Sequence, residues 1–276
     1  MNRGRLVIVG TGLQASAQMS PLACTHVAQA DKVLYLTTDV GAAAWLMTNN
    51  AGAESLERFY AVGKPRSETY EEIVEHVLGF VRSGFSVCMA VYGHPGVFAW
   101  ATHESVRRAR AEGYEARMLP AISAEDCLFA DLGVDPADHG CQSYEATDFL
   151  VHARALDLTS ALILWQIGVV GNLGFVDDAK RGLAVLVEAL VARYGAAHEA
   201  VIYRASPHPI IPPSIQRIAL GDMLTADVGP MSTLYVPPLE PARIDWEMAR
   251  RLGLHRELVP DENYVFSPMV RGARRD

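Results

Sequence analysis

Three tyrosines and one arginine are the residues of this chain whose types and spacing favour chemistry. Tyr60, Arg66 and Tyr70 follow one another within eleven positions, and Tyr92 comes directly after an apolar run. A phenol ionises near a pKa of about 10, while a guanidinium keeps its charge at any ordinary pH. Such a set is unusual for a catalytic centre. It suits the removal of a proton from a very weak acid better than ordinary hydrolysis.

The segment after Tyr92 has the sequence GHPG at residues 93–96 and joins an expected strand at 87–91 to an expected helix at 97–112. Two glycines and a proline fix an unusual backbone path, which lets a ligand lie against main-chain amides. His94 has the chemistry of a base or a zinc ligand, but no second His or Cys stands nearby to complete a metal site. We interpret His94 as a loop residue near a cofactor and predict no metal.

Three other positions carry weaker signals. Gly10 and Gly12 follow an apolar run without the full G-x-G-x-x-G pattern, so a plain strand-to-helix turn explains them as well as a cofactor loop. Ser123 is expected at a helix N-terminus, where it either caps the helix or leaves amides for a ligand carboxylate or hydroxyl. Gln166 ends an apolar strand, where its amide either binds a polar ligand group or is satisfied within the protein.

Alternation of short apolar runs with helical patterns predicts the elements that position these residues. Tyr70 belongs to the clearest amphipathic helix, which is expected at residues 67–82 with a capping box at Thr69 and Glu72. Further helices are expected from Ser20-Pro21 and at 179–194, and strands at 6–9, 33–36, 87–91, 161–165, 200–204, 215–220 and 232–236.

The order of these elements predicts an α/β fold of two lobes. Residues 1–119 are expected to form the first lobe, with a mainly parallel sheet and the Tyr/Arg cluster. Residues 120–240 are expected to form the second lobe, with a mixed sheet that completes a cofactor cleft. Residues 241–276 are assigned to a C-terminal extension.

Composition excludes several classes of function. The chain has 276 residues, a net charge of -8 and a pI of about 5.6, which disfavours nucleic-acid binding. Its basic cluster at Arg271, Arg274 and Arg275 is typical of a solvated tail. The four cysteines form no C-x-x-C pair, and no apolar run is long enough for a signal peptide or a membrane span. We therefore predict a reduced, cytoplasmic protein that contacts neither nucleic acid nor membrane.

Four sequence blocks together resemble the tetrapyrrole methylase-like class of S-adenosylmethionine-dependent methyltransferases. They are a strand-G-x-G start at 7–12, a strand-G-[DH]-P loop at 91–95, a P-x-[IV]-S block at 120–123 and a T-L-Y strand at 232–235. The resemblance covers residues 5 to about 240 and implies two α/β lobes with the cofactor in the cleft between them. The chain departs at Leu13, where the class usually has Pro, and at His94, where it usually has Asp.

Those departures indicate one branch, the borosin peptide α-N-methyltransferases, which methylate backbone amides of ribosomally made peptides. Tyr60, Arg66, Tyr70 and Tyr92 match the spacing of that family's catalytic residues, and the resemblance implies those roles here. In fused members the substrate is a C-terminal extension of the enzyme. The chain ends at Asp276 without a long apolar core peptide. It therefore resembles the split form, which acts on a separate precursor.

The resemblance also implies the cofactor and the residues that hold it. The cofactor is S-adenosylmethionine, which leaves as S-adenosylhomocysteine. The expected binding residues are Gly10, Gly12, Tyr92, His94, Val97, Phe98, Ser123, Gln166, Tyr203 and Thr233. A homodimer is implied as well, or a heterotetramer with the precursor, and the helix at 179–194 and the segment after Pro241 are candidates for the contact.

An amide nitrogen is a poor nucleophile because its lone pair is delocalised into the carbonyl. Methylation requires imidate character, with negative charge on the oxygen. We expect Arg66 or a phenol to hydrogen-bond that oxygen. One of Tyr60 and Tyr70 accepts the amide proton, with its pKa lowered by the guanidinium. Tyr92 walls the methyl and orients the amide.

Four other interpretations stay open at the level of sequence. The cluster could be structural, with Arg66 paired to Glu68 or Glu71. The enzyme could methylate a corrin or porphyrin ring, or an rRNA ribose, although the acidic charge argues against both. The protein could also bind the cofactor without turnover.

Overall fold

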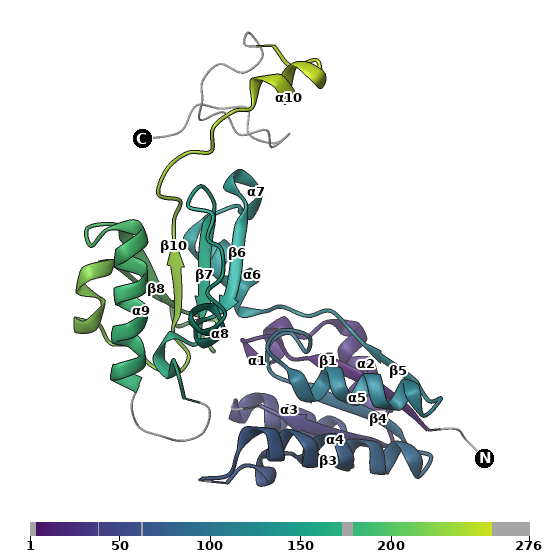
Figure 1. Ribbon diagram of the computed structural model, residues 1–276. Helices are drawn as coiled ribbons and strands as arrows, with labels where there is room; N and C mark the ends of the chain where they lie inside the picture. The colour runs from purple at the N-terminus through teal and green to yellow at the C-terminus, as the bar shows by residue number, and fades with distance from the viewer. Residues whose placement is uncertain (1–3, 38, 62, 173–178, 256–276) are drawn as a thin grey trace. The chain divides into compact units, whose positions relative to one another are not determined.

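A computed structural model describes residues 4–37, 39–61, 63–172 and 179–255, which group into two compact units (Figure 1). The first unit contains residues 4–131 together with 205–213. The second contains residues 132–172, 179–204 and 214–255. The first unit thus includes residues 120–131, which lie beyond the boundary predicted at 119. The basic cluster at Arg271, Arg274 and Arg275 lies outside the described residues, as does the last part of the predicted extension 241–276.

The first unit is built on a five-stranded sheet in which every pair of neighbours is parallel. Its order is β3 (Ala53–Ser55), β2 (Lys32–Leu36), β4 (Ser86–Val91), β1 (Arg5–Gly10) and β5 (Glu115–Met118). Helices bury both faces of the sheet, so its central strands read as near-continuous apolar runs.

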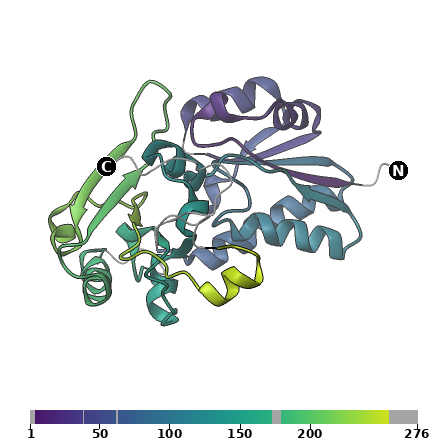
Figure 2. The same cartoon turned by 90° about the horizontal axis from the view of Figure 1, so that it is seen from above.

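Alternate residues of each strand enter different cores. Leu6 and Ile8 of β1 pack with α4 (Arg66–Arg82) and α5 (Trp100–Ala111), while Val7 and Val9 pack with α2 (Pro21–Gln29) and α3 (Val40–Asn49). The two pairs of helices lie on opposite sides of the sheet (Figure 2). Shorter elements complete the unit, namely α1 (Ala15–Gln18), the 3-10 turn η1 (Glu57–Phe59) and α6 (Ala124–Leu132).

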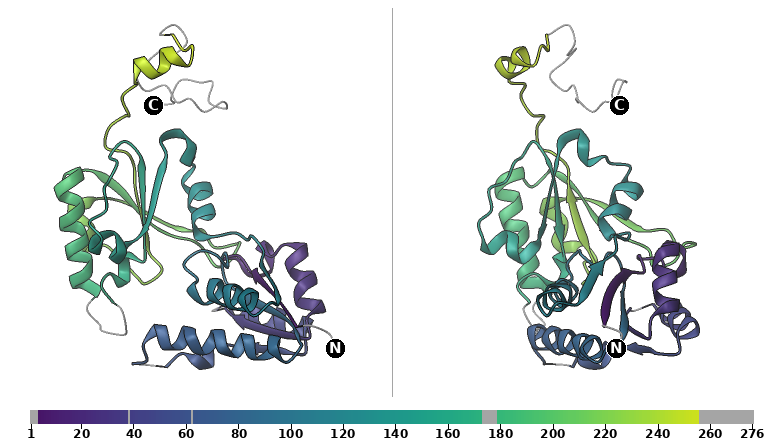
Figure 3. Two further views of the ribbon diagram at one scale, coloured as in Figure 1. Left: turned by 45° about the vertical axis from the view of Figure 1, so that its right-hand side comes forward. Right: turned by 90° about the vertical axis from the view of Figure 1, so that its right-hand side faces the viewer.

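The second unit contains a mixed sheet, in which β6 (Cys141–Glu145) pairs in parallel with β7 (Ala161–Trp165). The order continues antiparallel through β10 (Thr233–Val236), β8 (Glu199–Arg204) and β9 (Ser214–Ala219). The long helix α9 (Ala179–Tyr194) packs on this sheet (Figure 3). The remaining elements are α7 (Pro136–His139), α8 (Ala146–Val151), η2 (Ile167–Val169), η3 (Leu220–Thr225) and α10 (Trp246–Arg251).

The predicted fold class is confirmed, because the first sheet is parallel and the second is mixed. Two local predictions were wrong. The expected capping box fails because α4 begins at Arg66, which places Thr69 inside the helix; Glu72 instead pairs with Lys64 at 2.5 Å. The helix expected at residue 97 begins at Trp100, because a tight turn continues to Phe98, whose φ is 50°. Over the described ranges, no helix is long and apolar enough to cross a membrane.

Candidate active site

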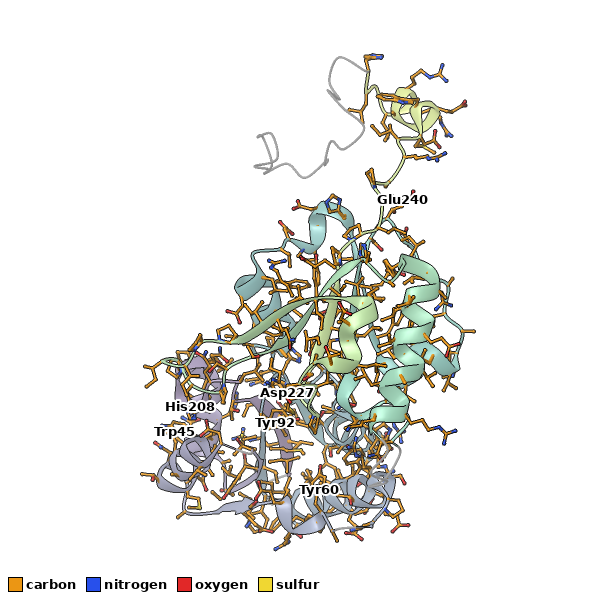
Figure 4. All side chains as sticks on the ribbon, turned by 90° about the vertical axis from the view of Figure 1, so that its left-hand side faces the viewer. Trp45, Tyr60, Tyr92, His208, Asp227 and Glu240 are labelled. Atoms are coloured by element: carbon orange, nitrogen blue, oxygen red, sulfur yellow. The ribbon has the colours of Figure 1, made fainter. Side chains whose placement is uncertain are left out.

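The Tyr/Arg cluster lies in the first unit, where three consecutive elements supply it. Tyr60 directly follows the 3-10 turn η1, Arg66 is the first residue of α4, and Tyr70 follows one helical turn later. Tyr92 directly follows β4, and its backbone N–H donates to the Leu36 carbonyl at 3.0 Å. Figure 4 shows the Tyr60 and Tyr92 side chains.

Aromatic contacts order the phenols of the cluster. The rings of Tyr60 and Tyr70 meet edge to face, with centroids 6.5 Å apart and planes at 74°. On its other side, Tyr70 stacks on Trp100 at 6.3 Å and 25°. Tyr60 and Tyr92 keep 38% and 43% of their surface exposed, so the cluster is ordered yet open to solvent.

Two phenols of this cluster, Tyr60 and Tyr92, are held in the neutral form. Burial raises the pKa of Tyr60 to about 12, with further increases from the neighbouring Tyr70 and Tyr92. Burial also raises the pKa of Tyr92, and Tyr70 adds to the effect. Arg66 lowers the pKa of both tyrosines, but by less than burial raises it. The expectation that the guanidinium sets the direction was therefore wrong for Tyr60.

The polar ends of the cluster have no partners of their own. Within the described ranges, the hydroxyls of Tyr60, Tyr70 and Tyr92 make no side-chain hydrogen bond, and Arg66 makes no ion pair. Glu71, which the structural interpretation assigned to Arg66, pairs instead with Arg108 at 2.5 Å. Tyr60 and Tyr92 are exposed, and Arg66 and Tyr70 are partly exposed. The polar ends of the cluster are therefore accessible to a ligand.

The cluster borders the position in the sheet where open α/β folds bind ligands. The connection that leaves β1 runs toward β2, and the connection that leaves β4 runs toward β5, so the topology favours a ligand-binding crevice at the carboxyl ends of β1 and β4. Gly10 and Gly12 lie there against the loop after β4. The Gly93 N–H donates to the Gly12 carbonyl at 2.8 Å, and a Cβ on Gly10 would lie 2.2 Å from the Gly93 oxygen.

The amides of the β1 loop are already satisfied by a side chain. Gln18 Oε1 accepts from the N–H groups of Leu13 and Gln14 at 2.7 and 3.0 Å. A phosphate cradle needs such amides free. The β1 loop is therefore shaped for close packing, and the exposed side of the crevice belongs to the loop after β4.

His94 shapes the loop after β4 from within. Its Nδ1 accepts from the Gly96 N–H at 2.9 Å, so a neutral ring carries its proton on Nε2. Its carbonyl accepts from the Val97 N–H at 3.2 Å. Phe98 follows in the left-handed region with 54% of its surface exposed. No group of three or more potential metal ligands occurs among the residues that the structure describes.

Ser123 caps α6 in a reciprocal arrangement. Its hydroxyl donates to Asp126 Oδ2 at 2.7 Å, its N–H donates to the same oxygen at 2.6 Å, and the Asp126 N–H donates back to its hydroxyl at 3.3 Å. The two alternatives considered for Ser123, helix capping and ligand binding, both placed it at the start of this helix. Because its own amide is occupied, a ligand here would meet the later amides of the turn.

Three of the expected cofactor residues lie in the second unit, at one end of its sheet. Gln166 directly follows β7 and adopts the left-handed conformation, with φ 60° and ψ 36°. Tyr203 and Thr233 are register partners on β8 and β10. The Tyr203 side chain is fully buried. Tyr203 therefore stays a prediction for which the structure offers no exposed side-chain surface.

The loops at the β1–β4 crevice fit an adenosyl sulfonium cofactor. Exposed apolar side chains, Tyr92, Phe98 and Ile122, follow the carboxyl ends of β4 and β5. A Cβ on Gly93 would meet only the Leu13 side chain, at 3.5 Å, so the outer side of this glycine is open. Aromatic faces suit both a purine and a cation. The occupied amides of the β1 loop match a cofactor without phosphates.

Sequence reasoning missed Trp100. The residue stacks on Tyr70 while 49% of its surface stays exposed. The chain offers one signal for it, because Trp100 stands just after the Gly/Pro turn that leaves β4. That signal was read as part of an ordinary helix.

Comparison with known proteins gives consistent matches. Residues 5–206 match the family model described as Tetrapyrrole (Corrin/Porphyrin) Methylases. The chain is 39% identical over 272 residues to a methyltransferase/ribosomally synthesized cyclic peptide gymnopeptides precursor of Gymnopus fusipes. That match covers 96% of this chain and 65% of the relative, so the chain spans less than two thirds of that protein.

Two further matches extend this result. A methyltransferase/ribosomally synthesized type I borosin cyclic peptide precursor of Coprinopsis marcescibilis is 37% identical, over 96% of this chain and 68% of the relative. The crystal structure of uroporphyrin-III-C-methyltransferase from Thermus thermophilus superposes with a TM-score of 0.61 at 17% identity, over 86% of this chain and 93% of that one. The second likeness concerns the fold alone.

Proposed function

This chain belongs to the tetrapyrrole (corrin/porphyrin) methylase family, and we propose that it is a methyltransferase that uses S-adenosylmethionine to methylate backbone amide nitrogens of a ribosomally made peptide. Its fold is that of the family. The names of the relatives support a peptide substrate, because each joins a methyltransferase to a cyclic peptide precursor.

One observation carries the proposal for the substrate. In the part of the chain that the structure describes, a guanidinium and three phenol hydroxyls converge without protein partners. A peptide amide offers complementary groups, namely a carbonyl oxygen that accepts from donors and an N–H that must lose its proton. Ring methylation at carbon does not call for that combination of groups.

The residues divide the work according to their charge. Burial raises the pKa of Tyr60 and of Tyr92, which keeps these two phenols protonated and able to donate. We therefore assign the third phenol, Tyr70, to accept the amide proton. Tyr60 and Arg66 donate hydrogen bonds to the carbonyl oxygen as it gains negative charge. Tyr92 walls the space beside the nitrogen and orients the amide.

The cofactor supplies an electrophilic methyl group when it is bound. The residues proposed to hold it come from both units. They are Gly10, Gly12, Tyr92, His94, Val97, Phe98 and Ser123 in the first unit, and Gln166, Tyr203 and Thr233 in the second. In this proposal the glycines allow close packing of two loops, and His94 keeps the loop after β4 in shape.

The proposal includes a peptide that arrives on a separate chain. The relatives carry their precursor within the same chain, which supports a peptide substrate and leaves its delivery to experiment. A homodimer, or a heterotetramer with the precursor, in the cytoplasm is the proposed working form.

The test is mass spectrometry of a peptide of valine, isoleucine and glycine residues, offered with S-adenosylmethionine both as a separate chain and fused to the C-terminus of the protein. We expect a gain of one methylene mass per methyl, placed on backbone nitrogen by fragmentation. Small reading frames beside the gene are co-expressed in the same way. Methylation of uroporphyrinogen with no methylation of any peptide would contradict the proposal.

A further inference from the structure

We propose that Trp100 is a positioning and substrate-specificity residue of this site. It holds the Tyr70 ring with one face and presents its exposed surface to the apolar side chain beside the amide that is methylated. This inference rests on the proposed peptide substrate.

The contact with Tyr70 is specific in geometry. The two rings are nearly parallel, at 25°, with centroids 6.3 Å apart, while Tyr60 meets the same Tyr70 ring edge-on. A phenol clamped by two aromatic neighbours loses rotational freedom, which keeps its oxygen in one place. Such positioning is what a proton acceptor needs, because a small displacement costs much of the rate.

The backbone that carries Trp100 is anchored to the loop after β4. Thr102 is buried, and its hydroxyl lies 2.5 Å from the Pro95 carbonyl and 2.6 Å from the Ala99 carbonyl. The His103 Nε2 lies 2.9 Å from the Gly96 carbonyl. The first turn of α5 is therefore tied to the segment that includes His94 and follows Tyr92.

A second anchor joins α5 to the helix of Tyr70. Arg108 on α5 bonds both oxygens of Glu71, the residue that follows Tyr70, at 2.5 and 2.8 Å. It also reaches Glu75 at 3.0 Å. Trp100 and Tyr70 are thus fixed to each other through their helices as well as through their rings.

The exposure of Trp100 argues for a role beyond packing. A tryptophan placed only for stability buries most of its large surface. Trp100 leaves 49% of its surface exposed while its ring stacks on Tyr70, whose hydroxyl makes no side-chain hydrogen bond among the described residues. An aromatic wall at this place suits an aliphatic side chain, and it would restrict substrates with charged side chains at the methylated position.

The experiment follows the indole N–H signals of the cofactor-loaded protein by NMR during titration with the valine, isoleucine and glycine peptide. The chain has four tryptophans, and Trp100→Phe assigns the signal of interest. We expect the Trp100 signal to shift with peptide. The Trp165 signal is the internal control and should stay in place, because its indole donates to Ser143 Oγ at 2.7 Å in the second unit.

Kinetics separate positioning from packing. We expect Trp100→Phe to keep kcat/KM within about threefold, and Trp100→Leu to lower it roughly tenfold, because only the phenyl ring preserves the stack. The ratio of kcat/KM for a peptide with glutamate at the methylated position to kcat/KM for the valine peptide should be higher with Trp100→Leu than with the wild type.

Two outcomes would overturn the role of Trp100 while the proposed function stands. Both require that the wild type methylates the peptide. In the first, Trp100→Leu keeps the full kcat/KM. In the second, the Trp100 indole signal does not shift when the peptide is added. If Trp100→Leu does not fold, the titration and Trp100→Phe still decide. A wild type that neither binds nor methylates any peptide would instead remove the proposed function, and with it the role of Trp100.

Discussion

Helix α4 has an arginine at each end, and the two arginines differ in their carboxylate partners. Arg82 at the last position donates to both oxygens of Glu112, at 2.8 and 2.6 Å, and to Glu75 at 2.8 Å. Arg66 at the first position has no carboxylate partner within the described ranges. The helix dipole favours a cation at the C-terminus and disfavours one at the N-terminus.

The comparison separates stability from function on one helix. Arg82 is placed where both the helix dipole and two carboxylates stabilise its positive charge. Arg66 is placed where the dipole opposes its charge, near Tyr60 and Tyr92, whose pKa values are raised by burial. An unfavourable residue that is kept among unpaired groups indicates a ligand-binding role. The expectations below test whether the two ends of α4 differ in this way.

The largest effect is expected for Tyr70→Phe. Removal of the proton acceptor should lower peptide methylation by about 10²–10⁴-fold. Mass spectrometry of the peptide measures the rate. The control is Tyr194→Phe, which removes a buried hydroxyl without a hydrogen-bond partner in the second unit and should leave the rate unchanged. Undiminished methylation by Tyr70→Phe would remove this residue from the chemistry.

Gly10→Ala should show the next effect, on stability. The new Cβ would lie 2.2 Å from the Gly93 oxygen, so the two loops of the crevice must separate. Overpacking of this kind costs about 1–3 kcal/mol in the free energy of unfolding. Urea unfolding measures the loss, and affinity for S-adenosylhomocysteine should fall with it.

The matched control is Gly79→Ala. Gly79 lies on the same helix as Tyr70, and a Cβ added there would meet nothing within 4 Å. Alanine is the better helix former, so this variant should gain roughly 0.5–1 kcal/mol. Equal stability of Gly10→Ala and Gly79→Ala would show that the loops of the crevice are not closely packed.

Alkaline pH should lower the free energy of unfolding through Tyr60, which lies near the Arg66 end of α4. The folded pKa of Tyr60 is about 12, above its usual value of 10. The stability that the neutral phenol contributes is therefore full below about pH 10 and is lost as the pH rises toward about 12. In urea unfolding, Tyr60→Phe should lose less stability than the wild type across this window. An identical loss in both proteins would contradict the raised pKa.

The smallest effect is expected for the paired end of the helix. Arg82→Met should lower the free energy of unfolding by about 0.2–1 kcal/mol, since its ion pairs lie at the surface, and added salt should reduce the difference. Arg66→Met should leave stability unchanged or raise it, because it removes a cation from the positive end of the dipole. A loss with Arg66→Met equal to that of Arg82→Met would erase the contrast.

Much of the fold could be predicted from local pattern. The bounds of α9 and β7 could be predicted from their apolar residues. An amphipathic helix repeats apolar residues every three or four positions, and a buried strand is a short apolar run. The start of α5 could not be predicted, since the left-handed turn at Phe98 is an unusual conformation for a residue with a side chain.

The proximity of the cluster residues could be predicted from the sequence, but their electrostatics could not. The order Tyr60, Arg66, Tyr70 identified a cluster that the structure brings together. The raised pKa of Tyr60 depends on burial and on Tyr92, which comes from a different element. Trp100 was missed for the same reason, because its stack on Tyr70 exists only once α4 and α5 pack together.

The most direct test of the account is a single-turnover comparison of Arg66→Lys with Arg82→Lys, each loaded with S-adenosylmethionine and mixed with the same peptide. A lysine keeps the charge but loses the planar fork that holds a carbonyl oxygen. We predict that Arg66→Lys slows formation of the N-methyl peptide by about 10²–10³-fold, and that Arg82→Lys proceeds at the wild-type rate. Equal rates for the two variants would contradict the assignment of Arg66 to the reacting amide.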